Sequence, residues 1–185
     1  GMARVLSLAM TTLAFAVADP PRAAREPAVA GVRLYYGPSK ETAAVDLETL
    51  RRARSSIDMA AYVLTDRGLI ETLDEAGRRG VKVRIYLDGD DSSRTSGKSA
   101  EALAALEKAP GVTIRRKATG RDPMHLKSYL VDRRTLRTGS ANFSYSGERF
   151  QDNDVVLLDS PALAGAFSRN FETIWTRADN REAAR

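Results

Sequence analysis

The chain has 185 residues, of which 43% are hydrophobic; this suits one folded domain and excludes wholesale disorder. It contains no cysteine, so disulfide bonds and thiolate chemistry are excluded. The 29 Lys and Arg residues exceed the 24 Asp and Glu residues, and the net charge of +5 suits a polyanionic partner without requiring one.

Residues 1–18 have the pattern of a secretory signal peptide. Arg4 precedes an apolar run, and Ala16 and Ala18 supply the small residues of a cleavage site. The run is too short to span a bilayer comfortably, although an uncleaved N-terminal anchor is the alternative. We therefore expect cleavage after Ala18, a periplasmic or secreted location, and no transmembrane segment in the mature chain. Residues 19–30, rich in Pro and Ala, predict a linker before a folded domain at 31–185.

Strands and helices alternate through the first part of this domain. In chain order the pattern predicts a strand from Val32 to Tyr36, a helix from Thr42 to Arg54, a strand from Ile57 to Leu64, a helix from Gly68 to Arg79, a strand from Val81 to Leu87, a helix from Ser99 to Lys108 and a strand from Val112 to Lys117. Asp66 is the expected N-cap of the second helix. Ala44, Leu47 and Leu50 are the expected buried face of the first.

Two polar stretches in this region are candidates for binding. The loop from Asp88 to Lys98 is rich in carboxylates, but their order does not match a calcium-binding loop, so we expect no metal there. Positive charge near the next strand is a candidate for contacting a phosphate backbone, and it is carried by Arg115, Arg116, Lys117 and Arg121.

The segment that follows carries the most specific pattern of the chain. His125 to Val131 predicts a strand, in which alternate side chains share a face. His125 and Lys127 should therefore point the same way, and Leu126 should point into the core.

A hairpin should bring a second group of polar residues back to His125. Asp132 opens the turn, and Thr135 to Thr138 predicts the returning strand. Gly139 allows the backbone to approach a ligand closely. Ser140 and Asn142 offer hydrogen-bond donors to anionic oxygen. We assign Asp132 to holding the turn rather than to touching a substrate.

The last part of the chain predicts a loop from Phe143 to Gln151, a strand from Asp154 to Leu158 and a helix from Pro161 to Arg177. The apolar side of that helix should consist of Leu163, Phe167, Phe171, Ile174 and Trp175. Trp175 is expected in the core or in a dimer contact. Together the elements predict an α/β fold with one domain, in which helices flank both faces of a mixed sheet.

These residue types suit chemistry on a phosphate. A histidine can attack phosphorus as a nucleophile and form a covalent intermediate. Lys127 would stabilise the charge that develops on the nonbridging oxygens, and with Ser140 and Asn142 would bind the phosphate. His125 is the only histidine, and no ligand cluster adjoins it, so we expect neither a metal nor another cofactor. A lone histidine on a strand is more often a partly buried side chain with satisfied hydrogen bonds, but here it stands among five further polar or glycine positions.

His125, Lys127, Asp132, Gly139, Ser140 and Asn142 match the full HKD motif of the phospholipase D superfamily. The chain resembles that family's small bacterial endonucleases, which carry one motif per chain. The resemblance implies a homodimer in which one His125 is the nucleophile and the other protonates the leaving oxygen. It also implies an acidic partner for the histidine after the motif. Asp154 is our first choice and Asn153 the second; alternatively, Asp154 merely opens a strand.

The resemblance implies a metal-independent phosphodiesterase, with residues 31–185 as its catalytic domain. Our first hypothesis is a non-specific endonuclease that cleaves DNA or RNA through a phosphohistidine. A phospholipase D-type enzyme acting on phosphatidyl lipids is the alternative, although the sequence shows no apolar stretch suited to an interface. A nucleic-acid-binding protein without turnover is a third hypothesis, and the intact motif argues against it.

Overall fold

The computed structural model describes residues 30–90, 95–120 and 122–182. The predicted signal peptide, nearly all of the predicted linker, Asp91 and Arg121 lie outside these ranges.

The predicted strands and helices are all present, with their ends shifted by a few residues. The strands are β1 (Val32–Tyr36), β2 (Ser56–Ala61), β3 (Lys82–Leu87), β4 (Val112–Arg116), β5 (Lys127–Val131), β6 (Thr135–Gly139), β7 (Asp154–Asp159) and β8 (Arg181–Glu182). The helices are α1 (Lys40–Arg51), α2 (Arg67–Arg78), α3 (Gly97–Leu106), α4 (Tyr145–Arg149) and α5 (Pro161–Trp175). Only α4 and β8 were not predicted, because each is too short to show a periodic pattern.

The strands form a mixed sheet, as predicted, in the order β1-β7-β6-β5-β2-β3-β4-β8. β2, β3 and β4 run parallel to one another, and every other pairing is antiparallel. Because β5, β6 and β7 alternate in direction, the start of β5, the end of β6 and the start of β7 lie at one edge of the sheet. We call this the motif edge.

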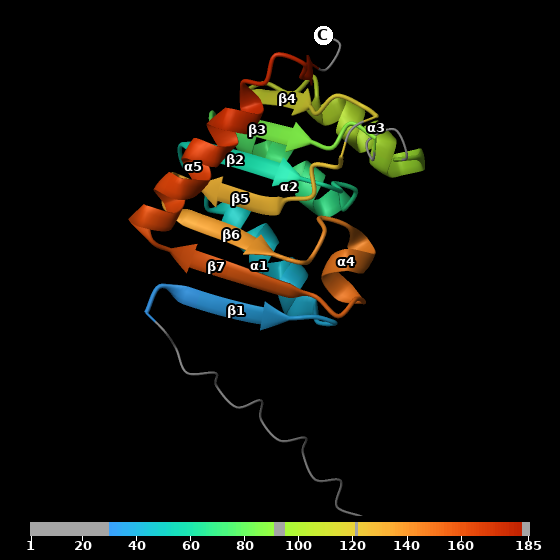
Figure 1. Cartoon of the computed structure of the whole chain (residues 1–185). Coiled ribbons are helices and arrows are strands. Elements are labelled where there is room, and N and C mark those ends of the chain that lie inside the picture. Colours follow the sequence, from blue (N-terminus) through green and yellow to red (C-terminus); the bar gives the residue numbers. More distant parts are fainter. Residues whose placement is uncertain (1–29, 91–94, 121, 183–185) are drawn as a thin grey trace, which may run out of the picture.

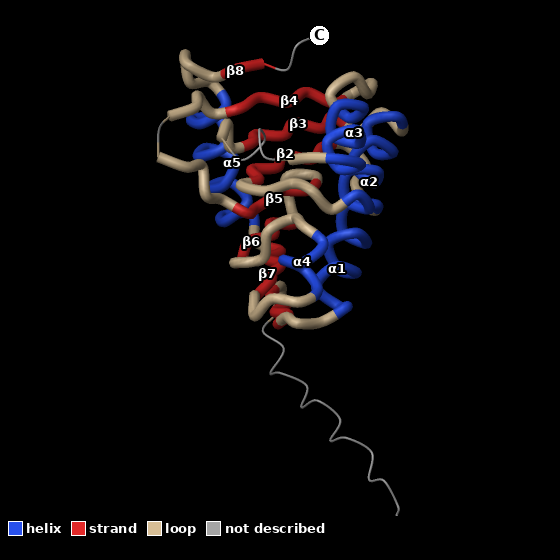
Figure 2. Tube along the Cα trace, turned by 90° about the vertical axis from the view of Figure 1, so that its right-hand side faces the viewer, coloured by secondary structure: helices blue, strands red, loops and turns tan. Residues whose placement is uncertain are grey.

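Helices cover both faces of the sheet (Figure 1). α1, α2, α3 and α4 lie on one face, and α5 crosses the opposite face, as the turned view in Figure 2 shows. The larger core lies beneath α1, α2 and α3 and includes Leu50, Ile57, Met59, Leu69, Leu73, Val83, Ile85 and Tyr129. The smaller core beneath α5 includes Tyr86, Phe171, Ile174 and Trp175, which confirms the prediction that Trp175 is a core residue.

The buried face of α1 differs from the prediction. Asp66 caps α2 as expected, accepting from the amide of Leu69, but Ala44 on α1 is exposed. Its neighbour Ala43 is buried, and Asp46 is fully buried. The prediction is confirmed for Leu50, which is fully buried, and Leu47 packs partly buried against the core. It missed Asp46 because it counted only apolar residues, whereas this helix points a carboxylate inward.

Two leucines predicted in apolar surroundings are also exposed. Leu126 is 37% exposed because β5 begins only at Lys127, so Leu126 lies at the end of the sheet. Leu163 is 44% exposed near the start of α5, whose apolar contacts are made mainly by its later turns. None of the described helices is long and apolar enough to cross a membrane.

Candidate active site

His125 and Lys127 lie together at the motif edge. The Nζ atom of Lys127 is 3.2 Å from Nε2 of His125 and donates to the carbonyl oxygen of His125 at 2.9 Å. His125 is exposed, whereas Lys127 is 7% exposed. Burial, and secondarily the positive charge of Arg137, lower the pKa of Lys127. The two side chains therefore point the same way, as predicted, with the imidazole open to a ligand.

Tyr62 is a third member of this group that the sequence did not reveal. Its ring centroid is 4.6 Å from that of His125, and Nζ of Lys127 lies 5.0 Å from the same ring. Tyr62 follows β2, which pairs with β5, so only the sheet pairing brings it to the motif. A flat ring beside both groups limits the rotamers that they can adopt.

Gly139, Ser140 and Asn142 lie at the same edge because β6 returns antiparallel to β5. Gly139 has φ of 140°, and a side chain there would collide with the backbone of Asp154, so this position requires glycine. Ser140 is exposed and donates from Oγ to Asn153 at 3.0 Å. Within the described residues, the buried Oδ1 atom of Asn142 has no hydrogen-bond partner. The hairpin thus places its polar groups next to the His125 end.

Asp154 lies beside Ser140. Its Oδ1 atom accepts from the backbone amide of Ser140 at 3.0 Å, and its own amide donates to Ser140 Oγ at 2.9 Å. The hydrogen bond with Ser140 is the main cause that lowers the pKa of Asp154. Neither Asp154 nor Asn153 has a described hydrogen bond to His125. The role of either residue as the histidine's partner remains a prediction, and their observed contacts hold Ser140.

Asp132 lies at the other end of β5, which is five residues and therefore roughly 17 Å long. Its carboxylate accepts from the amides of Arg54, Ser55 and Ser56 at 2.8 to 3.2 Å. Burial would raise its pKa, but these hydrogen bonds outweigh burial and lower it. The backbone φ of Asp132 is 52°, in a tight hairpin turn. This placement agrees with the assignment of Asp132 to holding the turn.

A buried ion pair supports the motif edge from beneath. Arg137 on β6 and Asp46 on α1 are both 0% exposed, and Nη2 of Arg137 lies 2.8 Å from the carboxylate. Nη1 of Arg137 donates to the carbonyl oxygens of Lys127 at 2.7 Å and Ala141 at 3.1 Å. Tyr129 donates to Asp46 at 2.7 Å. Arg137 therefore ties the start of β5 to the segment that carries Ser140 and Asn142. Sequence spacing could not reveal this pair, because its partners are far apart in the chain.

Glu148 on α4 is a second buried group that the sequence did not reveal. It is 1% exposed, and neither carboxyl oxygen has a hydrogen-bond partner within the described residues. Burial, followed by the negative charge of Asp46, raises the pKa of Glu148 from 4.5 to about 9. Glu148 is therefore protonated in the folded protein at neutral pH.

This protonation predicts a pH-dependent stability difference for Glu148→Gln. Between pH 4.5 and about 9 the carboxyl group is ionised in the unfolded chain and protonated in the folded one. Folded wild-type protein then binds the extra proton, so its stability falls as pH rises, by at most about 1.4 kcal/mol per pH unit. Glutamine does not titrate. In urea unfolding, the free energy of unfolding of the variant should therefore rise relative to that of wild type from pH 5 to pH 8. A stability difference that is the same at both pH values would contradict the assignment.

The basic residues before the motif have partners within the chain. Arg115 donates to Glu182 at 2.8 Å and to the carbonyl oxygen of Trp175 at 2.8 Å. Arg116 pairs with Glu107, and Lys117 donates to the carbonyl oxygen of Asp122. A phosphate-binding role for these residues remains a prediction.

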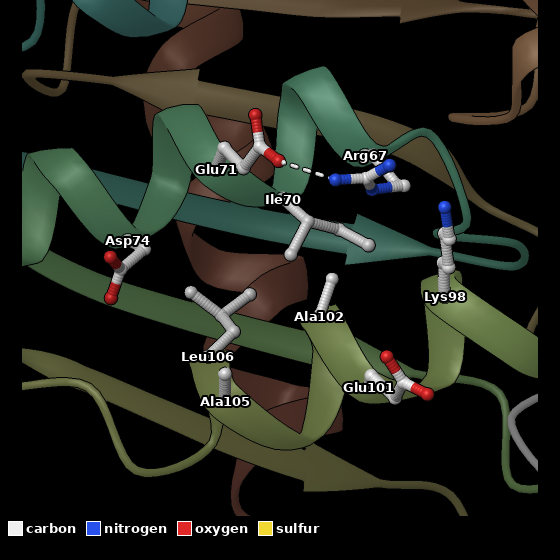
Figure 3. A pocket seen from close by; sticks show the side chains of 9 residues that line it. All are labelled: Arg67, Ile70, Glu71, Asp74, Lys98, Glu101, Ala102, Ala105 and Leu106. Carbon is white, nitrogen blue, oxygen red and sulfur yellow. Dashed lines mark hydrogen bonds and ion pairs between the residues drawn. The ribbon is translucent and has the colours of Figure 1, made fainter.

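A cleft of about 450 Å³ lies between α2 and α3, and no motif residue lines it. Figure 3 shows both acidic and basic side chains around it: Arg67 and Lys98 lie at one end, and the carboxylates are Glu71, Asp74 and Glu101. Nowhere in the described ranges do three His, Asp or Glu side chains gather in a way that could hold a metal ion. The motif edge is therefore the candidate active site.

Comparison with known proteins places this geometry in a family. Residues 47–175 match the family model described as cardiolipin synthase, PLD-like domain. The chain belongs to the phospholipase D superfamily. The match includes β5 and β6 with the whole HKD motif, so the resemblance inferred from the motif is confirmed.

The relatives that the chain matches within the superfamily are named for different activities. The chain is 29% identical over 133 residues to a mitochondrial cardiolipin hydrolase of Danio rerio and 30% identical over 125 residues to a phospholipase D of Rickettsia felis. These matches cover 72% and 65% of the chain but only 56% and 57% of the relatives' own length. The structure of Nuc, a phospholipase D family member from Salmonella typhimurium, is similar with a TM-score of 0.72 and 28% identity, over 83% of this chain and 98% of Nuc. The phospholipase D-like fold is thus confirmed.

Proposed function

We propose that this protein is a phosphodiesterase that cleaves nucleic acid through a phosphohistidine at His125. The observation that carries the proposal is the exposed imidazole of His125 with the Lys127 ammonium 3.2 Å from Nε2. A bound phosphate diester would take the place of Nε2 as the partner of the Lys127 ammonium. The ammonium would then contact the phosphate oxygens, and Nε2 would be free to attack phosphorus. Ser140 and Asn142 would complete its binding.

The proposed reaction has two steps. Nε2 of His125 attacks phosphorus, a P–N bond forms, and the P–O bond to the leaving group breaks as the leaving oxygen takes a proton from the second histidine, His125 of the partner subunit. Water then attacks phosphorus and gives a proton back to that histidine, and the P–N bond breaks to free the nucleophile. General acid–base catalysis of this kind typically contributes about 10²–10⁴-fold in rate.

Nucleic acid is our first candidate for the substrate for two reasons. The net charge of +5 suits a polyanion. The chain also spans almost all of Nuc, in keeping with the small single-motif endonucleases that it resembles, whereas it spans just over half of the relatives named for lipid substrates.

A lipid substrate is the second candidate, favoured by the names of those relatives and by one feature that the sequence did not predict. The fold brings large exposed apolar side chains from separate segments to or beside the motif edge: Tyr36, Leu126, Tyr145 and Phe150.

One assay panel distinguishes the two candidates. Single-stranded DNA, duplex DNA, RNA, phosphatidylcholine and cardiolipin would be incubated with the protein in EDTA. We expect cleavage of nucleic acid with the chelator present, because no side chain of the proposed mechanism needs a metal. Cleavage of the lipids alone would transfer the proposal to the second candidate. Loss of all activity in EDTA, restored by a divalent metal, would contradict the histidine mechanism.

The proposal includes a homodimer, because the chain has one histidine and the mechanism needs two. An exposed apolar strip on the outer strand β1 supports the dimer. Its residues alternate along the strand and so share one face of the sheet. They are Val32, Leu34 and Tyr36, which are 36%, 39% and 63% exposed. Tyr36 pairs with Asp154, so one end of this apolar strip lies next to the motif edge. A second copy is a suitable partner for the strip, since it would bring a second His125 to the site.

Mixing variants tests the dimer. If each site needs His125 from both subunits, wild-type subunits are active only with wild-type partners. After subunit exchange with an equal amount of His125→Ala protein, activity should fall to about half, and with a ninefold excess to about one tenth. Activity that follows the wild-type content alone, or full activity in a sedimenting monomer, would rule out a shared site. Leu34→Glu should shift the protein toward monomer.

A further inference from the structure

A second concave surface lies beside the motif edge. It is a groove of about 510 Å³ between the start of α1 and α4, and we call it the α1–α4 groove. Lys40, Ala44 and Leu47 line it from α1, and Tyr145, Arg149 and Phe150 line it from α4 and the residue after it. Figure 1 shows α4 at the end of the sheet to which β6 points, which is the end that carries Ser140.

One side chain joins α4, a wall of this groove, to the candidate active site. Oδ1 of Asn153 accepts from Ser140 Oγ at 3.0 Å, and Nδ2 of Asn153 donates to the carbonyl oxygen of Gly147 in α4 at 2.8 Å. The carbonyl oxygen of Asn153 also accepts from Gly37, just before the start of the groove, at 2.7 Å. Asn153 therefore bridges Ser140 of the candidate active site and α4, the helix that forms one wall of the groove.

The groove combines exposed rings with positive charge. Tyr145 is 60% exposed and Phe150 is 65% exposed, and their ring centroids lie 5.6 Å apart in an edge-to-face arrangement. Arg149 lies 4.5 Å from the centroid of Tyr145 while donating to Asp66 at 2.6 Å. Lys40 is exposed at the first turn of α1. Its neighbour Glu41 does not line the groove, and neither does any other carboxylate of the described residues.

This combination matches the chemistry of an unpaired nucleotide. Bases stack on aromatic rings, each stacked base contributing about 1–3 kcal/mol, while nearby cations bind the phosphates. The cleft between α2 and α3 differs, since its carboxylates, Glu71, Asp74 and Glu101, outnumber its cations, Arg67 and Lys98 (Figure 3). In duplex DNA the bases are stacked within the helix, and their faces cannot reach a ring in a groove.

We propose that the α1–α4 groove binds an unpaired base of a nucleic-acid strand whose neighbouring phosphate is cleaved at His125. The inference rests on the proposed function and adds a preference for single-stranded substrate. Tyr145 and Phe150 supply the stacking surface, and Lys40 binds a flanking phosphate.

The test compares two substrates in the full-length protein. Variant Tyr145→Ala/Phe150→Ala would be assayed on a single-stranded oligodeoxynucleotide and on methyl 4-nitrophenyl phosphate, a diester without bases. We expect the ratio of kcat/KM values, oligonucleotide over small diester, to fall by about tenfold or more relative to wild type. Leu163→Ala, which removes an exposed apolar side chain on α5, is the matched control and should keep the wild-type ratio. Thermal unfolding would show that both variants are folded.

The charge is tested in the same way. Lys40→Ala should weaken oligonucleotide binding and reduce its salt dependence by about one released ion, whereas Lys108→Ala, beyond the far end of α3, should not.

An unchanged ratio in the double variant overturns the groove proposal and leaves the proposed function standing. Wild-type protein that cleaves no nucleic acid overturns both. A double variant that loses only phosphatidylcholine vesicle hydrolysis overturns the nucleotide assignment in favour of lipid.

Discussion

Replacing His125 with alanine should remove nearly all catalysis, by at least about 10⁴-fold in kcat. Loss of a covalent nucleophile has effects of this size or larger in other enzymes. No thiol and no second imidazole can take over, since the chain has neither cysteine nor another histidine. Because the side chain is exposed and packs mainly against Tyr62, the variant should unfold at nearly the wild-type temperature. His125→Asn should behave in the same way.

The measurement is single-turnover cleavage of the best substrate from the assay panel, with circular dichroism as the folding control. Near-normal turnover by folded His125→Ala protein would show that another group attacks phosphorus. A large loss that accompanies unfolding would not count as support, so the control is part of the experiment.

Replacing Lys127 with alanine should lower kcat by about 10²–10³-fold, the usual cost of removing one group that stabilises transition-state charge. The ammonium is fixed by its hydrogen bond to the carbonyl oxygen of His125. The backbone carbonyl oxygen of Lys127 accepts a hydrogen bond from Arg137. Lys127→Met keeps most of the buried stem and should lose a similar amount, which would separate the charge from the packing. If Lys127→Met retained most of the activity, the charge would not be what the reaction uses.

The pH dependence gives a second measure of Lys127. Its pKa is lowered by burial, so it loses its proton at a lower pH than an ordinary lysine. The charged form is the active one, and activity should therefore decline with rising pH earlier than an unperturbed lysine would allow. A kcat profile that stays level through the normal lysine range would contradict this assignment.

The parts of the site that the sequence predicted are those encoded locally. His125 and Lys127 lie two residues apart on an extended segment, and the turn at Asp132 returns Ser140 to them, so periodicity alone fixes their arrangement. The order of strands and helices along the chain was predicted for the same reason, because each element carries its own pattern.

The parts that the sequence did not predict depend on contacts between distant segments. Asp46 was counted among the polar residues of α1, and only the fold shows that it faces Arg137. Glu148 lies within a predicted loop, and its burial follows from a helix too short to detect. The exposure of Leu126 depends on where β5 begins, which is the least reliable feature of a sequence pattern.

The central claim is the covalent bond between His125 and phosphorus. It is tested most directly by mixing the enzyme with a strand labelled at an internal phosphate, denaturing it rapidly at neutral pH and mapping the label by mass spectrometry of peptides. We predict label on the peptide that contains His125, formed before the labelled fragment is released by water and absent in His125→Ala protein. Label on any other residue, or product formed at full rate with no labelled protein at any time, would contradict the account.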